Sequence, residues 1–219
     1  MMIMQNMTIN SVYGASNLAS TDRQSAAQQL AEQFPIVKKA QEEVAPMQTR
    51  QASKDPLDLI DELLSKYLGE QTNRAEGMAD NIKVRSDAIA EISRLWGLVM
   101  QDNMNYTDPN DNGRKTPLGD TPESEGYLRK IDTIIKEKLG DERGISAITG
   151  KNIEQSITYN ASYTDLQSLD ATVTAFNDTI QVDIDTEQQR FKNVMTEISS
   201  AQEEIRDVRQ VIVRLSQAS

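Results

Sequence analysis

The last third of the chain carries the most regular spacing of apolar residues. They recur every seven residues in two interleaved series: Ile184, Phe191, Ile198, Ile205, Ile212, and Ile180, Val194, Ala201, Val208, Leu215. Glu187 is the one charged member of the second series. This spacing predicts a coiled-coil strand. Because no Pro or Gly follows Lys151, one helix from about residue 163 to 216 is allowed, roughly 80 Å long at about 1.5 Å per residue.

A second heptad seam lies within residues 75–99. Steps of three and four residues join its members, which are Ala75, Met78, Ile82, Arg85, Ile89, Ile92, Trp96 and Val99. Trp96 is expected in the core rather than in a ligand site. Arg85, like Glu187, interrupts an apolar seam, and the two residues either fix the register by pairing or are solvent-facing irregularities. The two seams are separated by enough chain to pack lengthwise, so we predict an antiparallel intramolecular coiled coil.

A shorter helix is predicted just before this second seam. Asp55 is a candidate N-cap, and Pro56 takes the first helical position, where its missing N–H costs nothing. Its apolar face ends at Leu68, and Gly69 is expected as a stop or a kink. Part of the longer C-terminal strand is expected to pack on this helix, on the N-terminal segment, or on another molecule.

The N-terminal segment divides into an uncharged stretch and a broken helix. Residues 1–21 contain no charged side chain and are expected to be disordered, as an ordinary terminus or as a leader recognised in an extended state. They do not have the pattern of a Sec signal peptide. Residues 22–50 predict a helical hairpin interrupted at Pro35, because the residue before a proline is biased away from helix. The hairpin halves are too short to be stable alone.

The middle of the chain, residues 105–160, is expected to form a loop and a small insertion module. A helix is predicted over residues 123–139, and the pairs Ile148-Thr149 and Ile157-Thr158 suggest one short strand pair between residues 141 and 159. The segment Asp108-x-Asn110-x-Asn112-Gly113 matches the first half of an EF-hand loop. Position twelve of that loop should be a bidentate Glu but is Gly119, so a solvated turn is the expectation.

Together these patterns predict a mainly α protein, an elongated antiparallel coiled coil with an N-terminal helical hairpin and a small mixed insertion module. The predicted segments are residues 1–21 (leader), 22–50 (hairpin), 55–104 (first arm), 105–160 (loop and module) and 161–219 (long C-terminal helix).

Composition and charge limit the kinds of catalytic, metal and partner sites that the chain can form. The chain has 219 residues and a net charge of −11, with no Cys and no His. Thiolate nucleophiles, Ser-His pairs, imidazole bases and Cys/His zinc sites are therefore excluded, and the carboxylates lie at helical spacings between Lys and Arg. We expect no catalytic residue, no cofactor and no metal. Nucleic acid, whose phosphates require clustered basic residues, is not an expected partner, and no direct membrane span is expected.

The order of these parts resembles that of a known family. Residues 159–170, beginning Tyr159-Asn-Ala-Ser, and residues 183–190 look like the start of the C-terminal coiled-coil helix of the hydrophilic translocator, or needle-tip, proteins of type III secretion systems. Residues 55–64 look like the helix that opens their first arm. More distantly, the chain is similar to type III secreted filament proteins. In that family the N-terminal hairpin lies against the coiled coil and hinders premature association.

The resemblance implies a secreted structural protein at the bacterial surface, on the tip of the secretion needle. Its partners would be the needle subunit, further copies of itself as a homo-oligomer, and the hydrophobic translocator proteins. Alternatives are a filament subunit, or an effector or adaptor whose coiled coil binds a host or chaperone helix. A cytosolic coiled-coil protein without export is a further alternative. The residues expected to carry self-association or needle docking are Ile205, Val208, Ile212 and Leu215, unless they are internal core. The coiled-coil seam is expected to include Ile82, Ile89, Ile92, Trp96, Ile184, Phe191, Val194 and Ile198.

Overall fold

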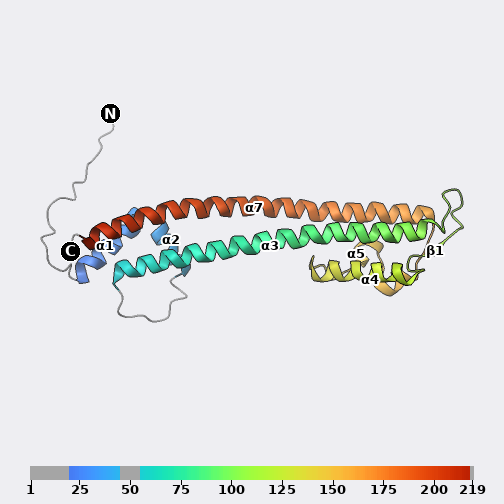
Figure 1. Cartoon of the computed structure of the whole chain (residues 1–219), viewed down its shortest axis with the longest axis horizontal. Coiled ribbons are helices and arrows are strands. Elements are labelled where there is room, and N and C mark those ends of the chain that lie inside the picture. Colours follow the sequence, from blue (N-terminus) through green and yellow to red (C-terminus); the bar gives the residue numbers. More distant parts are fainter. Residues whose placement is uncertain (1–19, 45–54, 218–219) are drawn as a thin grey trace, which may run out of the picture. The chain divides into compact units, whose positions relative to one another are not determined.

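The computed structural model describes residues 20–44 and 55–217. They are mainly helical, and the long helix α3 packs against the long helix α7 (Figure 1). The elements in chain order are α1 (Ser20–Gln33), α2 (Pro35–Val44), α3 (Pro56–Met104), β1 (Thr116–Pro117), α4 (Pro122–Glu137), α5 (Ser146–Thr149), α6 (Ile153–Ile157), β2 (Asn160–Ala161) and α7 (Tyr163–Gln217). The predicted leader, residues 1–21, falls almost entirely outside the described residues, as do residues 45–50 of the predicted hairpin.

The chain divides into two compact units that share the two long helices. Unit 1 comprises Met1–Ala75 and Asn193–Ser219, and unit 2 comprises Glu76–Lys192. Each unit has its own buried apolar cluster. The first part of α3 and the last part of α7 therefore belong to unit 1, whereas their remaining parts belong to unit 2.

Helix α3 is longer than the sequence pattern predicts. The expected stop at Gly69 does not occur, and the two predicted helices are one 49-residue helix, Pro56–Met104. A glycine within a helix costs about 1 kcal/mol relative to alanine, which packing along a long helix readily offsets. The start is as predicted, with the Asp55 carboxylate accepting the Leu57 N–H at 3.1 Å.

Unit 1 is built from segments that lie far apart in the sequence. Helices α1 and α2, which meet at Phe34-Pro35, contact each other and pack with the first part of α3 and the last part of α7. Their buried residues are Leu30, Ile36, Val37, Ala40, Val44, Leu57, Ile60, Leu63, Leu64, Tyr67, Ala201, Ile205 and Val208. The predicted N-terminal helix pair and its break at Pro35 are confirmed.

In unit 2, α3 and α7 run in opposite directions. The polar contacts between them show this, because Asn81 pairs with Glu187, Arg85 with Asp183, and Trp96 with Asp170. Trp96 is a core residue as predicted, with 2 % of its surface exposed, and its indole N–H donates to Asp170 Oδ1 at 3.2 Å.

The two charged residues of the seams form an ion pair. Arg85 Nη1 lies 3.6 Å from Glu187 Oε2, and both side chains are about one-fifth exposed. Asn81 donates to the other Glu187 oxygen at 2.8 Å, and Arg85 also reaches Asp183 at 3.1 Å. Of the two interpretations left open by the sequence, pairing is confirmed. A buried polar pair of this kind favours one helix register over its neighbours.

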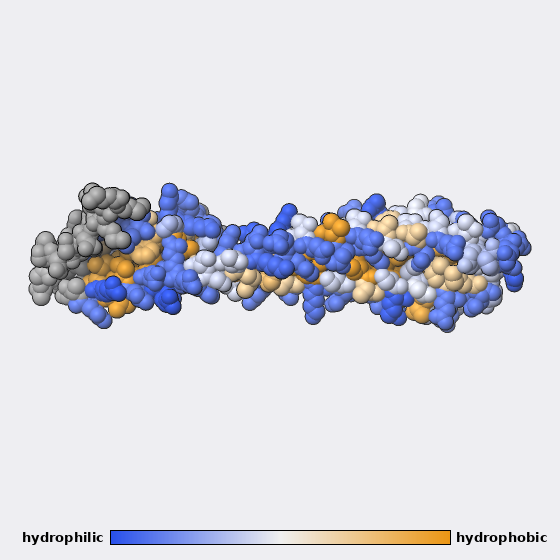
Figure 2. All heavy atoms as spheres, turned by 90° about the horizontal axis from the view of Figure 1, so that it is seen from above, coloured by the Kyte–Doolittle hydropathy of each residue, from blue (hydrophilic) through white to orange (hydrophobic). Residues whose placement is uncertain are grey.

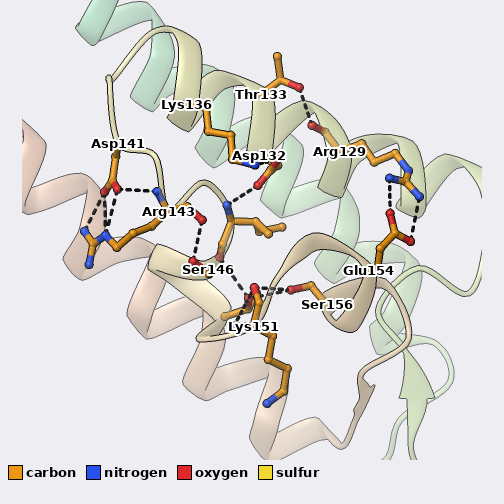
Figure 3. Close-up of polar contacts among 12 residues, drawn as sticks. Arg129, Asp132, Thr133, Lys136, Asp141, Arg143, Ser146, Lys151, Glu154 and Ser156 are labelled. Carbon is orange, nitrogen blue, oxygen red and sulfur yellow. Dashed lines mark hydrogen bonds and ion pairs between the residues drawn. The ribbon is translucent and has the colours of Figure 1, made fainter.

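The module between the long helices packs on unit 2 mainly through α4. Thr121 caps α4 by accepting the Ser124 N–H at 3.0 Å, and Pro122 takes the first helical position, so the predicted helix is confirmed within two residues. Leu128, Ile131 and Ile135 of α4 are fully buried. Figure 3 shows how polar contacts tie the module together, including Arg129 with Glu154 at 2.9 Å.

Asp132 organises the turn that follows α4. Its carboxylate accepts the Ile145 N–H at 2.8 Å and pairs with Lys136 at 2.8 Å (Figure 3). Gly144 lies against this carboxylate with a positive φ of 55°. A side chain there would clash with Asp132 as well as strain the backbone, so the turn requires glycine.

The predicted strand pair within residues 141–159 is wrong. Ile148-Thr149 and Ile157-Thr158 lie in or at the end of the short helices α5 and α6, where Asn152 and Gln155 form a capping box. The strand pair of this region joins β1 to β2 instead, with Thr116 opposite Ala161. Strand propensity of Ile and Thr was outweighed by the cap and by burial of the isoleucines.

Candidate functional site

The residues predicted for the coiled-coil seam all face inward to some degree. Ile92, Trp96, Ile184, Val194 and Ile198 are buried, and Ile82, Ile89 and Phe191 are half-buried.

The residues predicted for docking do not form an open surface. Ile205 and Val208 are 2 % and 0 % exposed, and both belong to the buried cluster of unit 1. Ile212 and Leu215 are half-buried and pack against the same cluster. The sequence left open whether these four residues carry docking or form internal core, because an apolar stripe does not show what covers it. Within unit 1, Ile205 and Val208 lie in the core.

Helix α2 is one of the elements that cover this stripe. Its buried residues Ile36, Val37, Ala40 and Val44 share one cluster with Ala201, Ile205 and Val208 of α7. Within unit 1, the heptad stripe of α7 and the apolar face of α2 are thus buried in the same cluster. We call these residues of α7 the covered stripe.

The N-terminus of α2 is held by a carboxylate from α7. The Ile36 N–H, one of the amides that a helix start leaves without an internal partner, donates to Glu204 Oε1 at 2.9 Å. Negative charge is also favourable next to the positive end of the helix dipole. Glu204 therefore holds the hairpin in place through one charge-assisted hydrogen bond.

Lys39 forms the second polar contact of α2 with its surroundings. Its ammonium lies 5.7 Å from the centre of the Tyr67 ring and 4.0 Å from Glu197 of α7. A hydrogen bond to Tyr67, together with the nearby carboxylates, raises the pKa of Lys39 above its ordinary value. Since Lys39 is largely exposed, this contact adds little to stability.

Two further polar contacts join α1 and α2 to α3 and its cap. Gln71 donates to Glu43 at 3.0 Å, and Arg23 of α1 pairs with Asp55. Burial of the apolar face of α2 is thus the main attachment, with a few exposed or half-exposed polar contacts around it. Such an attachment can open without breaking a buried charge pair.

The calcium-like segment is a hydrogen-bonded turn. Asp108 Oδ1 accepts the Asn110 N–H at 2.8 Å, Asp111 Oδ1 accepts the Gly113 N–H at 2.9 Å, and Asn112 Oδ1 accepts the Thr164 hydroxyl at 2.8 Å. The side-chain oxygens therefore stabilise the turn and its contact with α7. Across residues 20–44 and 55–217, no cluster of three or more His, Cys, Asp or Glu is placed to hold a metal ion.

None of the described helices combines the length and the apolar character needed to cross a membrane. One face of the molecule is mostly hydrophilic, with hydrophobic atoms visible in limited areas (Figure 2).

Sequence reasoning missed the role of Glu204 and Lys39. Both read as ordinary solvated charges in the helical pattern, and no local motif connects residue 36 with residue 204 across 168 positions. The one available signal was Pro35, which marks a helix start whose amides need an acceptor.

Neither family models nor curated proteins nor solved structures match this chain. Its function must therefore be argued from its own geometry. The structure has an apolar stripe on the long helix α7. A helix pair near the other end of the sequence, α1 and α2, covers it.

Proposed function

We propose that this chain is a secreted structural protein of a type III secretion apparatus, which caps the needle and acts as a platform for insertion of the hydrophobic translocators. In this role it binds the needle subunit and further copies of itself. The family resemblance of residues 55–64, 159–170 and 183–190 suggests the apparatus, and the absence of Cys and His from the sequence favours assembly over catalysis.

The observation that carries the proposal is the covering of the α7 stripe by α2. Ile205 and Val208 are the kind of apolar heptad residues that mediate helix association, and here they share one buried cluster with Val37 and its neighbours in α2 and with Leu64 and its neighbours in α3. A hairpin that is attached mainly by apolar burial suits a protein that must stay apart until it reaches its partner. Release of α1 and α2 would free the stripe for docking.

The way in which α3 and α7 pack is part of the same proposal. We infer that α3 and α7 pack as an antiparallel coiled coil, with knobs-into-holes packing at Ile92, Ile184 and their seam neighbours. The antiparallel direction in unit 2 and the Arg85–Glu187 pair support this. An experimental structure with regular a/d packing would test it directly.

The covering of the α7 stripe by α1 and α2 can be tested with purified protein. Deletion of residues 1–50 removes α1 and α2, so self-association should increase because Ile205 and Val208 lose their cover. The control is deletion of residues 1–19, which leaves both helices in place. Multi-angle light scattering would measure the mass, and an unchanged mass after the longer deletion would count against the covering role.

The location is tested in the bacterium that carries the gene. Immunogold electron microscopy should place the protein at needle tips, and the label should disappear when the secretion ATPase is inactivated. Label along long fibres would favour the filament alternative. Absence of label outside the cell would contradict export, and with it the proposed function.

A further inference from the structure

Two exposed faces of α7 carry opposite charges. Between Lys151 and Arg190 the sequence contains seven acidic residues and no Lys or Arg. After Asp207, in contrast, the only charged residues are Arg209 and Arg214. The acidic region of α7 belongs to unit 2 and the basic region to unit 1.

The acidic face is centred on an exposed valine of unit 2. Val182 is 64 % exposed, which is unusual for a large apolar side chain. Asp178 and Asp185, four residues before and three residues after it, are also exposed and share its side of the helix. We call Asp178, Val182 and Asp185 the acidic face.

The basic face likewise has an exposed valine flanked by charged residues, but these residues are arginines. Val213 is 52 % exposed and lies in a shallow open groove of about 440 Å³. The groove is lined by Arg206, Arg209, Gln210, Val213 and Arg214, and we call these residues the basic face. Arg209 is held in position by Asp61 at 2.6 Å and by the Ser65 hydroxyl at 2.8 Å. Arg206 and Arg214 are exposed, as are the neighbouring acidic residues Glu203 and Asp207, so this surface is basic where the three arginines line the groove and not on every side of it.

We propose that the basic face of one copy binds the acidic face of a second copy of this chain. Each face offers one apolar contact flanked by charges that match the other face. A protein with a net charge of −11 repels its own copies, and opposed charges of opposite sign offset this repulsion at the place of contact. At physiological salt, screening over about 8 Å removes most of the long-range repulsion and leaves such direct contacts.

This contact joins two different surfaces, so it is heterologous. A heterologous contact builds a ring when its rotation closes and a filament when it does not. The inference deepens the proposed assembly role and rests on it for its biological meaning, but it concerns a surface distinct from the covered stripe. The stripe would need release of the hairpin, whereas the acidic and basic faces are exposed in the folded chain.

Reversal of charge on each face tests the proposal with the full-length chain. R206E/R214E makes both faces acidic, and D178K/D185K makes both faces basic. Each double variant should raise the dissociation constant of self-association by more than about tenfold, because like charges then oppose each other. Sedimentation velocity across a concentration series in 0.15 M NaCl measures this constant. Arg209 is left unchanged because it also binds Asp61.

The decisive measurement is an equimolar mixture of the two double variants. Each altered face then meets a complementary face on the other variant, so association should return to near the unaltered level. The control R74E/K83E changes two exposed basic residues of α3 outside both faces, and it lowers the net charge by the same four units as R206E/R214E. It should associate like the unaltered protein. Circular dichroism checks that every variant keeps its helical content.

Three results would overturn the proposal. The first is an unaltered chain that stays monomeric at every concentration, and the second is a mixture that fails to regain association. The third is a loss with R206E/R214E but not with D178K/D185K, which would assign the basic face to a different acidic partner. None of these results bears on whether the protein is found at the needle, which the electron microscopy decides separately.

Discussion

Unit 1 and unit 2 bury apolar clusters in different ways. The cluster of unit 2 comes from one continuous stretch, Glu76–Lys192, and the module of α4 to α6 closes one side of it. The cluster of unit 1 combines residues near both ends of the sequence, so Val37 packs in the same cluster as Val208. Unit 2 also has polar contacts inside or beside its core, such as Trp96 with Asp170, whereas the polar contacts of unit 1 lie around the rim.

The difference indicates that unit 2 is the more stable unit and that unit 1 opens more readily. Loop closure costs somewhat more entropy in unit 1, where a contact joins residues 168 positions apart, than in unit 2, where comparable contacts join residues 74 and 106 positions apart. Local opening begins with elements that few buried contacts hold, and among the described side chains of α1 Leu30 alone is buried in unit 1. We therefore expect unit 1 to open, and α1 with α2 to leave, under conditions in which unit 2 stays folded.

The largest expected effect comes from a charge placed in the core of unit 1. Val208→Asp introduces a carboxylate at a fully buried position and should destabilise unit 1 by more than about 4 kcal/mol, because nothing there pairs with it. Val213→Asp, five residues on and 52 % exposed, is the matched control. Hydrogen exchange should show fast amides in α1 and α2 but protected ones in α4. Loss of protection in both units would mean that they do not open separately.

Truncation of the largest core side chain tests the other unit. Trp96→Ala should lower the free energy of unfolding of unit 2 by about 3 kcal/mol, through lost burial and the cavity that remains. Urea denaturation followed by circular dichroism measures it. Trp96→Phe, which keeps most of the apolar area but loses the bond to Asp170, should cost clearly less. Equal losses for the two variants would place the stabilisation in the hydrogen bond instead.

A smaller change, at Glu204, should weaken only the attachment of α2. Glu204→Gln removes the charge that receives the Ile36 N–H and should destabilise the attachment of α2 by about 1 kcal/mol. Glu203→Gln alters the exposed neighbour and serves as the control. Limited proteolysis should cut residues 20–44 faster in the first variant only. Equal rates would show that Glu204 contributes nothing to the attachment.

The smallest expected effect is a pH dependence of opposite sign in the two units. Hydrogen bonds from Ser162 at the start of α7 lower the pKa of Asp165 below its ordinary value of 3.8. Its stabilisation of unit 2 is therefore present above pH 3.8 and is lost as the pH falls through the lowered value. The raised pKa of Lys39 acts in the other direction, so its contribution to unit 1 is present below pH 10.5 and is lost as the pH rises through the raised value.

Thermal melts at pH 6 and pH 3 would measure the acid effect. Asp165→Asn should reduce the acid-induced loss by less than about 1 kcal/mol, since one cap is involved. Lys39→Met should in turn reduce the alkaline loss that hydrogen exchange detects in α2. A variant with the full pH dependence of the unaltered chain would contradict the corresponding assignment.

Much of the fold could be read from the sequence because its strongest signals are periodic. The long helix α7, the capped start of α3 and the break at Pro35 all follow from local chemistry, and the structure confirms them. Gly69 was misread because local propensity yields to packing along a long helix. The burial of Ile205 and Val208 was left open because an apolar stripe looks the same whether a neighbouring helix or a partner covers it.

The discontinuous core of unit 1 also sets the order in which the protein can mature. About 160 residues separate Val44 from Val208, and a ribosome adds roughly 5 to 20 residues per second. The newly made α2 therefore waits about 10 to 30 s for the helix it packs against. During that interval its apolar side chains are accessible to a chaperone, which gives the cell a period in which to keep the chain unfolded.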